Sequence, residues 1–405
     1  MGLDRVLPEL YARASWGMRL GLEPMRAACK QFDHPERGFE AAHIAGTNGK
    51  GSVAAMLESI VRETGKKTGL YTSPHLCRFA ERIRIDGKMI DDDVLASILS
   101  DVLTRAKDLS FFEAATLTAL VAFREAKVDV GVLEVGIGGR LDATNVIPPP
   151  RAAAVTRIAL DHTDRLGTTI EAIAREKAGI CKPGVDLVLG EMSEAARSAI
   201  NEVAVLSGGT SSRASDHARA RAVAERSSIA LAGAHQVKNA GVACVLGERL
   251  GADEGAQARG ISSVIWAGRL ETLEGQHGPT LLDAAHNPDG AASLARHLAA
   301  SGASPAKTAL VFGALADKEW KQMIEILAPL AQSRFYVAPK GRAATPPETI
   351  SAHFPGVICD SIESALARAR ATVGGGLVVV AGSIYLIGEA RAYLLGLAKD
   401  PPVAL

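Results

Sequence analysis

The chain has 405 residues, of which 47% are hydrophobic and 22% are charged. This composition is typical of a soluble globular protein, and the length predicts two domains. Lys plus Arg and Asp plus Glu number 45 each, so no net charge attracts nucleic acid or an anionic membrane. Neither partner is therefore expected.

The cysteines and the chain ends predict a cytoplasmic protein. The five cysteines are widely spaced and form no C-x-x-C pair, which indicates neither a disulfide framework nor a zinc site. Residues 1–10 lack the apolar core of a signal peptide. The apolar run over residues 377–387 is too short to span a bilayer.

A glycine-rich, cationic turn follows the apolar run over residues 41–45; it reads Gly46-Thr47-Asn48-Gly49-Lys50-Gly51-Ser52. From Ser52 onward the apolar residues recur at helical spacing, which predicts a strand, a loop and a helix. In such a loop, backbone N–H groups bind phosphate, Lys50 adds a positive charge, and Ser52 adds a hydroxyl near magnesium. The match to G-x-x-x-x-G-K-[ST] is imperfect, because two residues separate the glycines and Gly51 follows Lys50. The alternative is a glycine-rich turn without a ligand.

Two further predicted strands end in polar residues. The strand over residues 68–72 precedes Ser73, and the apolar strand over residues 128–135 carries Glu134 near its end. Ligands of open α/β sheets bind at the carboxyl ends of strands. A carboxylate before a glycine-rich turn suits a Walker-B-like role in holding magnesium. The alternative for Glu134 is an edge carboxylate beside a turn.

The next strand, residues 152–158, leads to His162, which lies between two aspartates. A neutral imidazole there could ligate a metal, although a lone histidine is usually structural. The following helix carries Lys177, which could be only a solvated charge. Residues 191–230 predict surface helices and a loop.

A second domain is predicted beyond a composition shift near residues 251–278. Strands over residues 280–282, 308–312, 334–337 and 377–380 are separated by helical segments. This alternation predicts a parallel, Rossmann-like α/β domain. No turn there matches G-x-G-x-x-G with an acidic partner, so dinucleotide binding is not expected.

Eight motifs, in their order along the chain, resemble those of the folylpolyglutamate synthase/dihydrofolate synthase family, the folate branch of the Mur ligases. They are residues 45–52, 73–76, 134–136 with 139–145, 161–163, 175–180, 233–240, 268–269 and 283–288. Each motif alone is weak evidence, whereas eight in order are specific. Residues 191–230 are not matched.

The resemblance implies an α/β fold with a P-loop ATPase domain of Mur ligase type over residues 1–270. A smaller Rossmann-like glutamate-ligase domain would occupy residues 271–405. The implied enzyme is an ATP-dependent ligase: a substrate carboxylate attacks the γ-phosphoryl of ATP, and the amino group of L-glutamate then displaces phosphate from the acyl phosphate. The implied substrate is dihydropteroate, a reduced folate, or both. Mg²⁺ is the implied cofactor, ATP is a co-substrate, and a monomer is expected.

The resemblance also implies roles for individual residues. Ser73, Glu134 and His162 would be on one magnesium ion, and Lys177, carbamylated by carbon dioxide, would hold a second. Those with catalytic roles would be Lys50, Glu134, His162 and Lys177. Those on the nucleotide would be Asn48, Gly49, Lys50, Gly51, Ser52, Asn239, Arg269, Asp283 and His286.

A dihydropteroate pocket is implied by three segments, whose residues are Leu20, Gly21, Leu22, Phe112, Glu113, Arg140, Leu141, Asp142 and Ala143. Phe112 offers a face on which a pterin could stack, and Asp142 offers an acceptor for the pterin's donors. Alternatively, Phe112 begins the core face of its helix and Asp142 caps the glycine-rich turn. Arg19 stands where bifunctional members often carry Asp, which favours a folate-only enzyme.

Two other functions compete with the folate ligase. One is another Mur-type amino-acid ligase, and the other, from a different class, is a nucleotide-binding regulatory protein. Residues 73–75 and 161–163 favour the folate branch. Retention of Lys50, Glu134, His162 and Lys177 argues against a regulatory protein without ligase activity.

Overall fold

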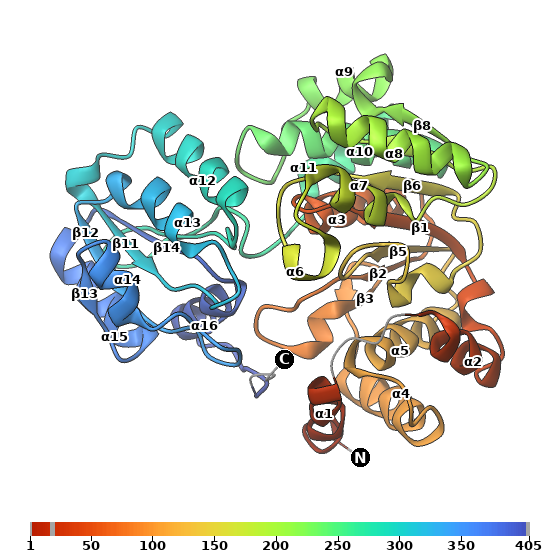
Figure 1. Ribbon diagram of the computed structural model, residues 1–405, viewed down its shortest axis with the longest axis horizontal. Helices are drawn as coiled ribbons and strands as arrows, with labels where there is room; N and C mark the ends of the chain where they lie inside the picture. Colours follow the sequence, from red (N-terminus) through yellow and green to blue (C-terminus); the bar gives the residue numbers. More distant parts are fainter. Residues whose placement is uncertain (1, 17–20, 402–405) are drawn as a thin grey trace. The chain divides into compact units, whose positions relative to one another are not determined.

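A computed structural model describes residues 2–16 and 21–401, and the chain divides into two compact units (Figure 1). The first unit comprises residues 1–75, 79–230 and 236–265, and the second comprises residues 76–78, 231–235 and 266–405. Each unit contains one sheet with helices packed on it. Within the described residues, no helix has the length and apolar character needed to cross a membrane.

The first sheet contains, in spatial order, β4 (Lys88–Met89), β3 (Ile83–Ile85), β2 (Thr68–Tyr71), β5 (Val130–Glu134), β1 (Glu40–Ala45), β6 (Ala152–Val155), β7 (Asp186–Leu189) and β8 (Thr210–Arg213). The strands that follow one another in space from β2 through β5, β1, β6 and β7 to β8 are parallel. Strand β3 pairs antiparallel with β2, and β4 pairs antiparallel with β3. The carboxyl ends of the parallel strands therefore share one edge. The phosphate loop, Ser73, Glu134 and His162 all follow or end strands at this edge.

The helices of this unit are α1 (Leu3–Ala12), α2 (Glu23–Gln31), α3 (Lys50–Arg62), α4 (Asp92–Arg105), α5 (Phe111–Glu125), α6 (Thr163–Leu166), α7 (Ile170–Ala178), α8 (Glu194–Leu206), α9 (Ala218–Arg226), α10 (His235–Arg249) and α11 (Glu254–Ser263). Two side-chain contacts show which faces of the sheet they cover. The Thr68 hydroxyl donates to Glu58 of α3, whereas a Cβ on Gly69 would lie 2.6 Å from the Phe123 ring of α5. Because successive strand residues face opposite sides, α3 and α5 cover opposite faces.

Two elements of this unit differ from the sequence-based expectation. Strand β8 lies in the segment predicted to be helices and a loop; its sequence is Thr-Ser-Ser-Arg, which has no apolar alternation because the strand is a partly exposed edge. Helix α11 lies within the Gly- and Ala-rich region taken as a boundary. A Cβ on Gly260 of α11 would lie 2.5 Å from Ile60 Cα, so the small residue allows α11 to pack closely on α3.

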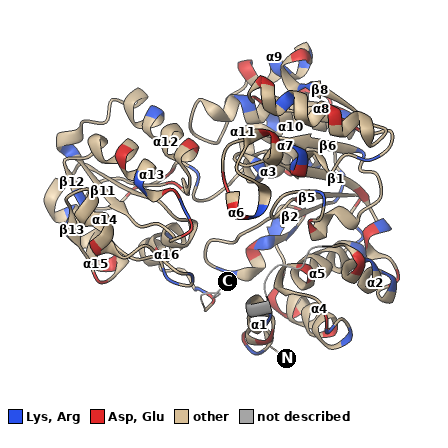
Figure 2. Cartoon of the chain, viewed as in Figure 1, with Lys and Arg blue, Asp and Glu red and all other residues tan. Residues whose placement is uncertain are grey.

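The second sheet contains, in spatial order, β13 (Val357–Ile358), β12 (Ser333–Tyr336), β11 (Thr308–Phe312), β14 (Leu377–Ala381), β10 (Thr280–Leu282) and β9 (Glu271–Leu273). All pairs are parallel except β9 with β10, which agrees with the predicted Rossmann-like arrangement. The helices are α12 (Pro288–Ala300), α13 (Trp320–Leu327), α14 (Pro347–His353), α15 (Ile362–Val373) and α16 (Ile384–Leu395). Apolar clusters lie on both faces. Basic and acidic residues are interspersed along the helices of both units (Figure 2).

Candidate active site

The phosphate loop is held in shape by the segment that follows β6. Thr47 N–H donates to the Arg157 carbonyl at 2.7 Å, and the Thr156 hydroxyl donates to the Asn48 carbonyl at 2.7 Å. Gly46 has φ +145°, and a Cβ there would lie only 1.9 Å from Thr156 Oγ1. Glycine is therefore required at this position, because any side chain would push the loop away from its support.

Helix α3 begins directly after this loop and leaves its first N–H groups without a side-chain cap. Lys50 Nζ donates to the Thr47 carbonyl at 3.2 Å. Ser52 is buried, and its hydroxyl accepts from Gln236 Nε2 at 3.3 Å. A Cβ on Gly49 would lie 2.8 Å from Asn239 Oδ1, so Asn239 of α10 lies beside the loop. The loop therefore presents backbone donors and a cation, the features that bind phosphate.

Glu134 and Ser73 are brought together at the same edge of the sheet. Glu134 is the last residue of β5 and pairs with Ile44 of β1, close to the start of the phosphate loop. Ser73 N–H donates to Glu134 Oε2 at 3.1 Å, and the Glu134 side chain is buried. A buried carboxylate at this edge of the sheet offers oxygen ligands, which a hard cation such as magnesium prefers.

Lys177 of α7 is 5% exposed, so the solvated-charge alternative does not hold. Burial, followed by the charge of Lys50, lowers its pKa to about 7, and Asp161 and Asp142 act in the opposite direction. The site thus contains two lysines and two carboxylates close enough to interact. At neutral pH a substantial fraction of Lys177 is the neutral amine.

His162 is the N-cap of the short helix α6 and has φ +49°. Its backbone N–H donates to Asp161 Oδ1 at 2.9 Å. Over residues 2–16 and 21–401, no group of three His, Cys, Asp or Glu side chains is arranged to hold a metal. Magnesium commonly takes only one or two protein ligands and completes its shell with phosphates and water. The metal role of His162 stays a prediction.

Asp142 is buried in the glycine-rich turn and accepts four hydrogen bonds. Its Oδ2 accepts from the backbone N–H groups of Gly136 and Ile137, both at 3.0 Å. Its Oδ1 accepts from Thr144 N–H at 3.0 Å and from the Thr144 hydroxyl at 2.6 Å. Four bonds occupy the lone pairs of a carboxylate. The alternative in which Asp142 caps the turn is therefore confirmed, and a pterin donor would have to replace one of these bonds.

The other predicted substrate residues fall into distinct environments. A Cβ on Gly136 would lie 2.4 Å from Phe112 Cζ, so the half-buried Phe112 ring lies against the turn that Asp142 holds. Glu113 completes the capping box of α5 by accepting from Ser110, and exposed Arg140 pairs with Glu176 at 2.9 Å.

The other residues predicted for the dihydropteroate pocket are described by their burial and backbone conformation. Leu22 and Ala143 are buried, Leu141 is half-buried, and Gly21 has φ +131°. Leu20 and Arg19 lie outside the described residues.

In the second unit, three predicted nucleotide residues, Arg269, Asp283 and His286, interact near the carboxyl end of β10. Asp283 follows β10 and accepts from Leu270 N–H at 2.9 Å and Ala285 N–H at 3.0 Å. Burial raises the pKa of Asp283, while the charges of Arg269 and His286 lower it. His286 Nδ1–H donates to the Ala284 carbonyl at 2.9 Å, which directs Nε2 away from the backbone.

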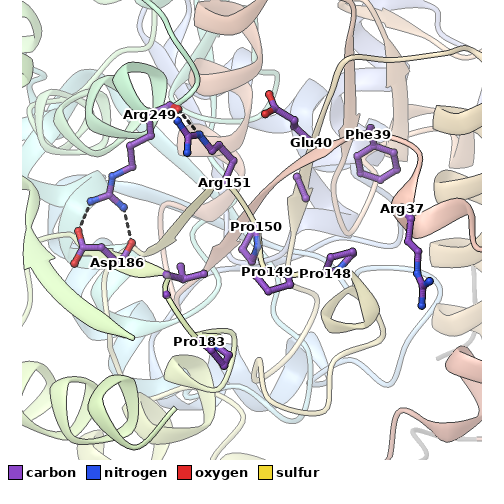
Figure 3. Close-up of a pocket in the computed structure, with 13 residues that line it drawn as sticks. Arg37, Phe39, Glu40, Pro148, Pro149, Pro150, Arg151, Pro183, Asp186 and Arg249 are labelled. Carbon is purple, nitrogen blue, oxygen red and sulfur yellow. Dashed lines mark hydrogen bonds and ion pairs between the residues drawn. The ribbon is translucent and has the colours of Figure 1, made fainter. Parts of the chain in front are cut away.

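A cavity of about 690 Å³ lies elsewhere in the first unit (Figure 3). Its lining includes Glu40 and Asp186, the first residues of β1 and β7, so it is at the amino edge of the sheet, opposite the phosphate loop. Arg249 pairs with Asp186, and Arg37 lies 3.3 Å from Glu36. None of the predicted site residues lines this cavity.

Comparison with known proteins identifies the family. The Mur ligase middle domain matches residues 44–247, and the Mur ligase glutamate ligase domain matches residues 268–384. The dihydrofolate synthase/folylpolyglutamate synthase of Escherichia coli is 34% identical over 85% of this chain and 84% of its own. The chain belongs to the folylpolyglutamate synthase/dihydrofolate synthase family of Mur ligases.

Members of the family also match in structure. Escherichia coli FolC in complex with DHPP and ADP has 30% identity and a TM-score of 0.88, covering 98% of both chains. The bifunctional enzyme of Yersinia pestis with Mn, AMPPNP and L-glutamate has 29% identity and a TM-score of 0.86, also covering 98% of both. A probable bifunctional folylpolyglutamate synthase/dihydropteroate synthase of Haloferax volcanii is 37% identical over 94% of this chain. The chain spans about half of that relative, 49%.

Several residues at the family site were not predicted from the sequence. Gln236 donates a hydrogen bond to the hydroxyl of Ser52 in the phosphate loop. The Nε of buried Arg82 donates to His75 Nδ1 at 2.9 Å. His43 is fully buried within β1 beside the glycine-rich turn. For His43, an imidazole within the apolar segment 41–45 was the available signal, since such a buried group requires a specific partner.

Proposed function

We propose that this protein is an ATP-dependent ligase that adds L-glutamate to dihydropteroate and to reduced folates through an acyl phosphate. The observation that carries the proposal is the placement of Lys50 and buried Lys177 beside an uncapped phosphate loop. The fold is shared with E. coli FolC, whose structure contains DHPP and ADP.

The residues of the phosphate loop would act mainly by positioning and charge neutralisation. Phosphoryl transfer to a carboxylate needs little acid or base chemistry, because charge spreads over the transferring group. The N–H groups at the start of α3 and the Lys50 ammonium would bind the triphosphate, with Asn48, Gly49, Gly51 and Ser52 contributing. Asn239 of α10 lies beside Gly49 and would contact the same nucleotide.

The residues at the edge of the sheet fit a magnesium ion. Glu134 is a buried carboxylate whose Oε2 is shared with the Ser73 amide. We propose Ser73, Glu134 and His162 as the protein residues around this ion, and carbamylated Lys177 as a ligand of a second magnesium. When bound, magnesium would neutralise charge that develops on the phosphoryl oxygens. Glu134 would hold the ion, and the Ser73 amide would orient Glu134.

Lys177 would join this site as a carbamate. The neutral Nζ would attack the carbon of CO₂, forming an N–C bond while the π bond of one C=O opens and leaves its electron pair on that oxygen. One proton would leave the nitrogen to solvent, so that the product is a carbamate anion. The lowered pKa of about 7 supplies the neutral amine that this step needs. Lys177→Ala should lose turnover and be partly rescued by short carboxylates, because the missing group is an anion. No rescue, together with unmodified Lys177 in a high-resolution map, would defeat this role.

The domain bounds and the remaining nucleotide residues are part of the proposal. We propose that residues 1–270 form the ATP-binding domain and residues 271–405 the glutamate-ligase domain. We propose Arg269, Asp283 and His286 as nucleotide contacts, as the resemblance to the family implies; Arg269 and His286 interact electrostatically with buried Asp283. A monomer and a cytoplasmic location stay predictions.

The position of Phe112 supports a pocket for the pterin that dihydropteroate and reduced folates both carry. The Phe112 ring lies against Gly136 and could stack on a pterin. We propose Glu113, next to Phe112, and Arg140, Leu141 and Ala143, in or beside the turn, as further residues of the pocket, with Leu20, Gly21 and Leu22 as its third segment. Asp142 would act by holding the turn under Phe112, since its four acceptor positions are occupied.

The test is phosphate release from ATP by purified protein, with and without L-glutamate, in the presence of dihydropteroate or tetrahydrofolate. Release that requires glutamate and occurs with both pterins is expected. Release with tetrahydrofolate alone would indicate a folate-only enzyme. Release with neither pterin would favour another Mur-type ligase or a nucleotide-binding regulatory protein. Phe112→Ala should raise the KM for dihydropteroate more than the KM for ATP.

A further inference from the structure

His43 lies in the middle of β1, where it pairs with Leu133 of β5 and Ala153 of β6. The side chain is fully buried. Its Nε2 lies 2.8 Å from Thr144 Oγ1. Its Nδ1 is buried without a hydrogen-bond partner among the described residues. A strand-centre residue facing a core is ordinarily apolar, so the imidazole needs a specific explanation.

The direction of the hydrogen bonds determines the tautomer of His43. The Thr144 hydroxyl lies 2.6 Å from Asp142 Oδ1, and the carboxylate must accept, so the hydroxyl donates to Asp142. The same hydroxyl oxygen must then accept from His43 Nε2–H. Burial, followed by the charge of Lys182, lowers the pKa of His43 to about 3, so the ring is neutral and Nδ1 carries a lone pair.

This chain of hydrogen bonds ends on the turn that separates two proposed catalytic residues. Asp142 holds the N–H groups of Gly136 and Ile137, immediately after Glu134 in sequence. Farther along the turn, a Cβ on Gly139 would lie 2.8 Å from the Lys177 carbonyl oxygen. Arg140 N–H donates to the Glu176 carbonyl at 3.0 Å. The turn therefore begins two residues after Glu134 and packs against the backbone of Glu176 and Lys177.

We propose that His43 is a positioning residue for ligation: through Thr144 and Asp142 it holds residues 136–142 and so places Glu134 and Lys177. This inference rests on the proposed function, because it gives those two side chains their roles. His43 itself touches neither of them in the described contacts and acts from within the sheet. Outer groups that orient site residues typically change activity by about 10- to 100-fold.

Three variants separate positioning from packing. His43→Leu removes the donor, and His43→Gln keeps an amide N–H at the position of Nε2. Val155→Ala shortens a fully buried side chain on β6 and removes no hydrogen bond. Glutamate-dependent phosphate release with tetrahydrofolate should fall about 10- to 100-fold in kcat for His43→Leu. It should stay within about 3-fold of wild type for His43→Gln, as the donor is retained. Val155→Ala should keep its kcat even if its Tm falls.

Two readouts do not depend on activity. Imidazole ¹⁵N NMR of the wild-type protein should show His43 protonated only at Nε2, and amide exchange at Gly136 and Ile137 should accelerate in His43→Leu but not in Val155→Ala. The Nδ1–H tautomer, unchanged exchange, or equal kcat losses in His43→Leu and Val155→Ala would overturn the inference. If wild-type protein releases no phosphate with either pterin, the proposed function fails, while the tautomer and the exchange rates still decide whether His43 holds the turn.

Discussion

Because the amine of Lys177 is buried, the free energy of unfolding of the first unit should depend on pH. Replacing Lys177 by a neutral side chain should remove this dependence. The pKa of Lys177 falls from 10.5 to about 7. This difference of about 3.5 pH units, at about 1.4 kcal/mol per unit, corresponds to at most about 5 kcal/mol. Because the pKa is lower in the folded state, the protonated form opposes folding.

The sign follows from proton binding in the two states. Below pH 7 both states bind the proton, and folding bears the full cost of the buried charge. Between pH 7 and 10.5 the unfolded state alone binds it, so the free energy of unfolding rises with pH. Lys177→Met should therefore be more stable than wild type near pH 6, by at most about 5 kcal/mol, and this advantage should vanish toward pH 10.5.

The assay is urea unfolding at several pH values in CO₂-free buffer, which prevents carbamate formation. Hydrogen exchange of peptides from β5 and α7 reports the first unit separately, because two units need not unfold together. Lys107→Met, at an exposed lysine, is the matched control and should differ from wild type by the same amount at every pH. If the stability of Lys177→Met differed from that of wild type by the same amount at every pH, the reasoning would be refuted.

Three further predictions address single contacts. Glu134→Gln should reduce turnover by about 100-fold or more without changing Tm, since it removes the buried carboxylate charge; an unchanged rate in a steady-state assay would count against a metal ligand. Gly49→Ala should weaken ATP binding measured by calorimetry, because φ is +88° and a Cβ would lie 2.8 Å from Asn239 Oδ1; an unaltered Kd would contradict this. Glu113→Ala should cost about 1 kcal/mol in urea unfolding through loss of the capping box, and Glu113→Gln should cost less; equal costs would argue against the box.

Much of the fold follows from local patterns in the sequence. Near-continuous apolar runs predicted β1 and β5, because strands buried on both faces need no alternation. The glycines and Lys50 located the phosphate loop, since the required backbone conformations are local. Strand β8 and helix α11 were missed, because their existence depends on neighbours: β8 pairs with β7, and α11 packs against α3.

The sequence by itself therefore determined which strands end in polar residues and predicted where phosphate would bind, because periodicity and loop chemistry act over a few residues. The tertiary structure decided what individual polar groups do. The sequence left Asp142 open between a ligand contact and a turn cap, and the folded turn fills its acceptor positions with donors of the nearby residues 136, 137 and 144. From the sequence, Lys177 could be a metal-site residue or a solvated charge, and packing excludes the second by burying it near Lys50. Burial and electrostatic coupling join segments more than a hundred residues apart, and no local pattern records them.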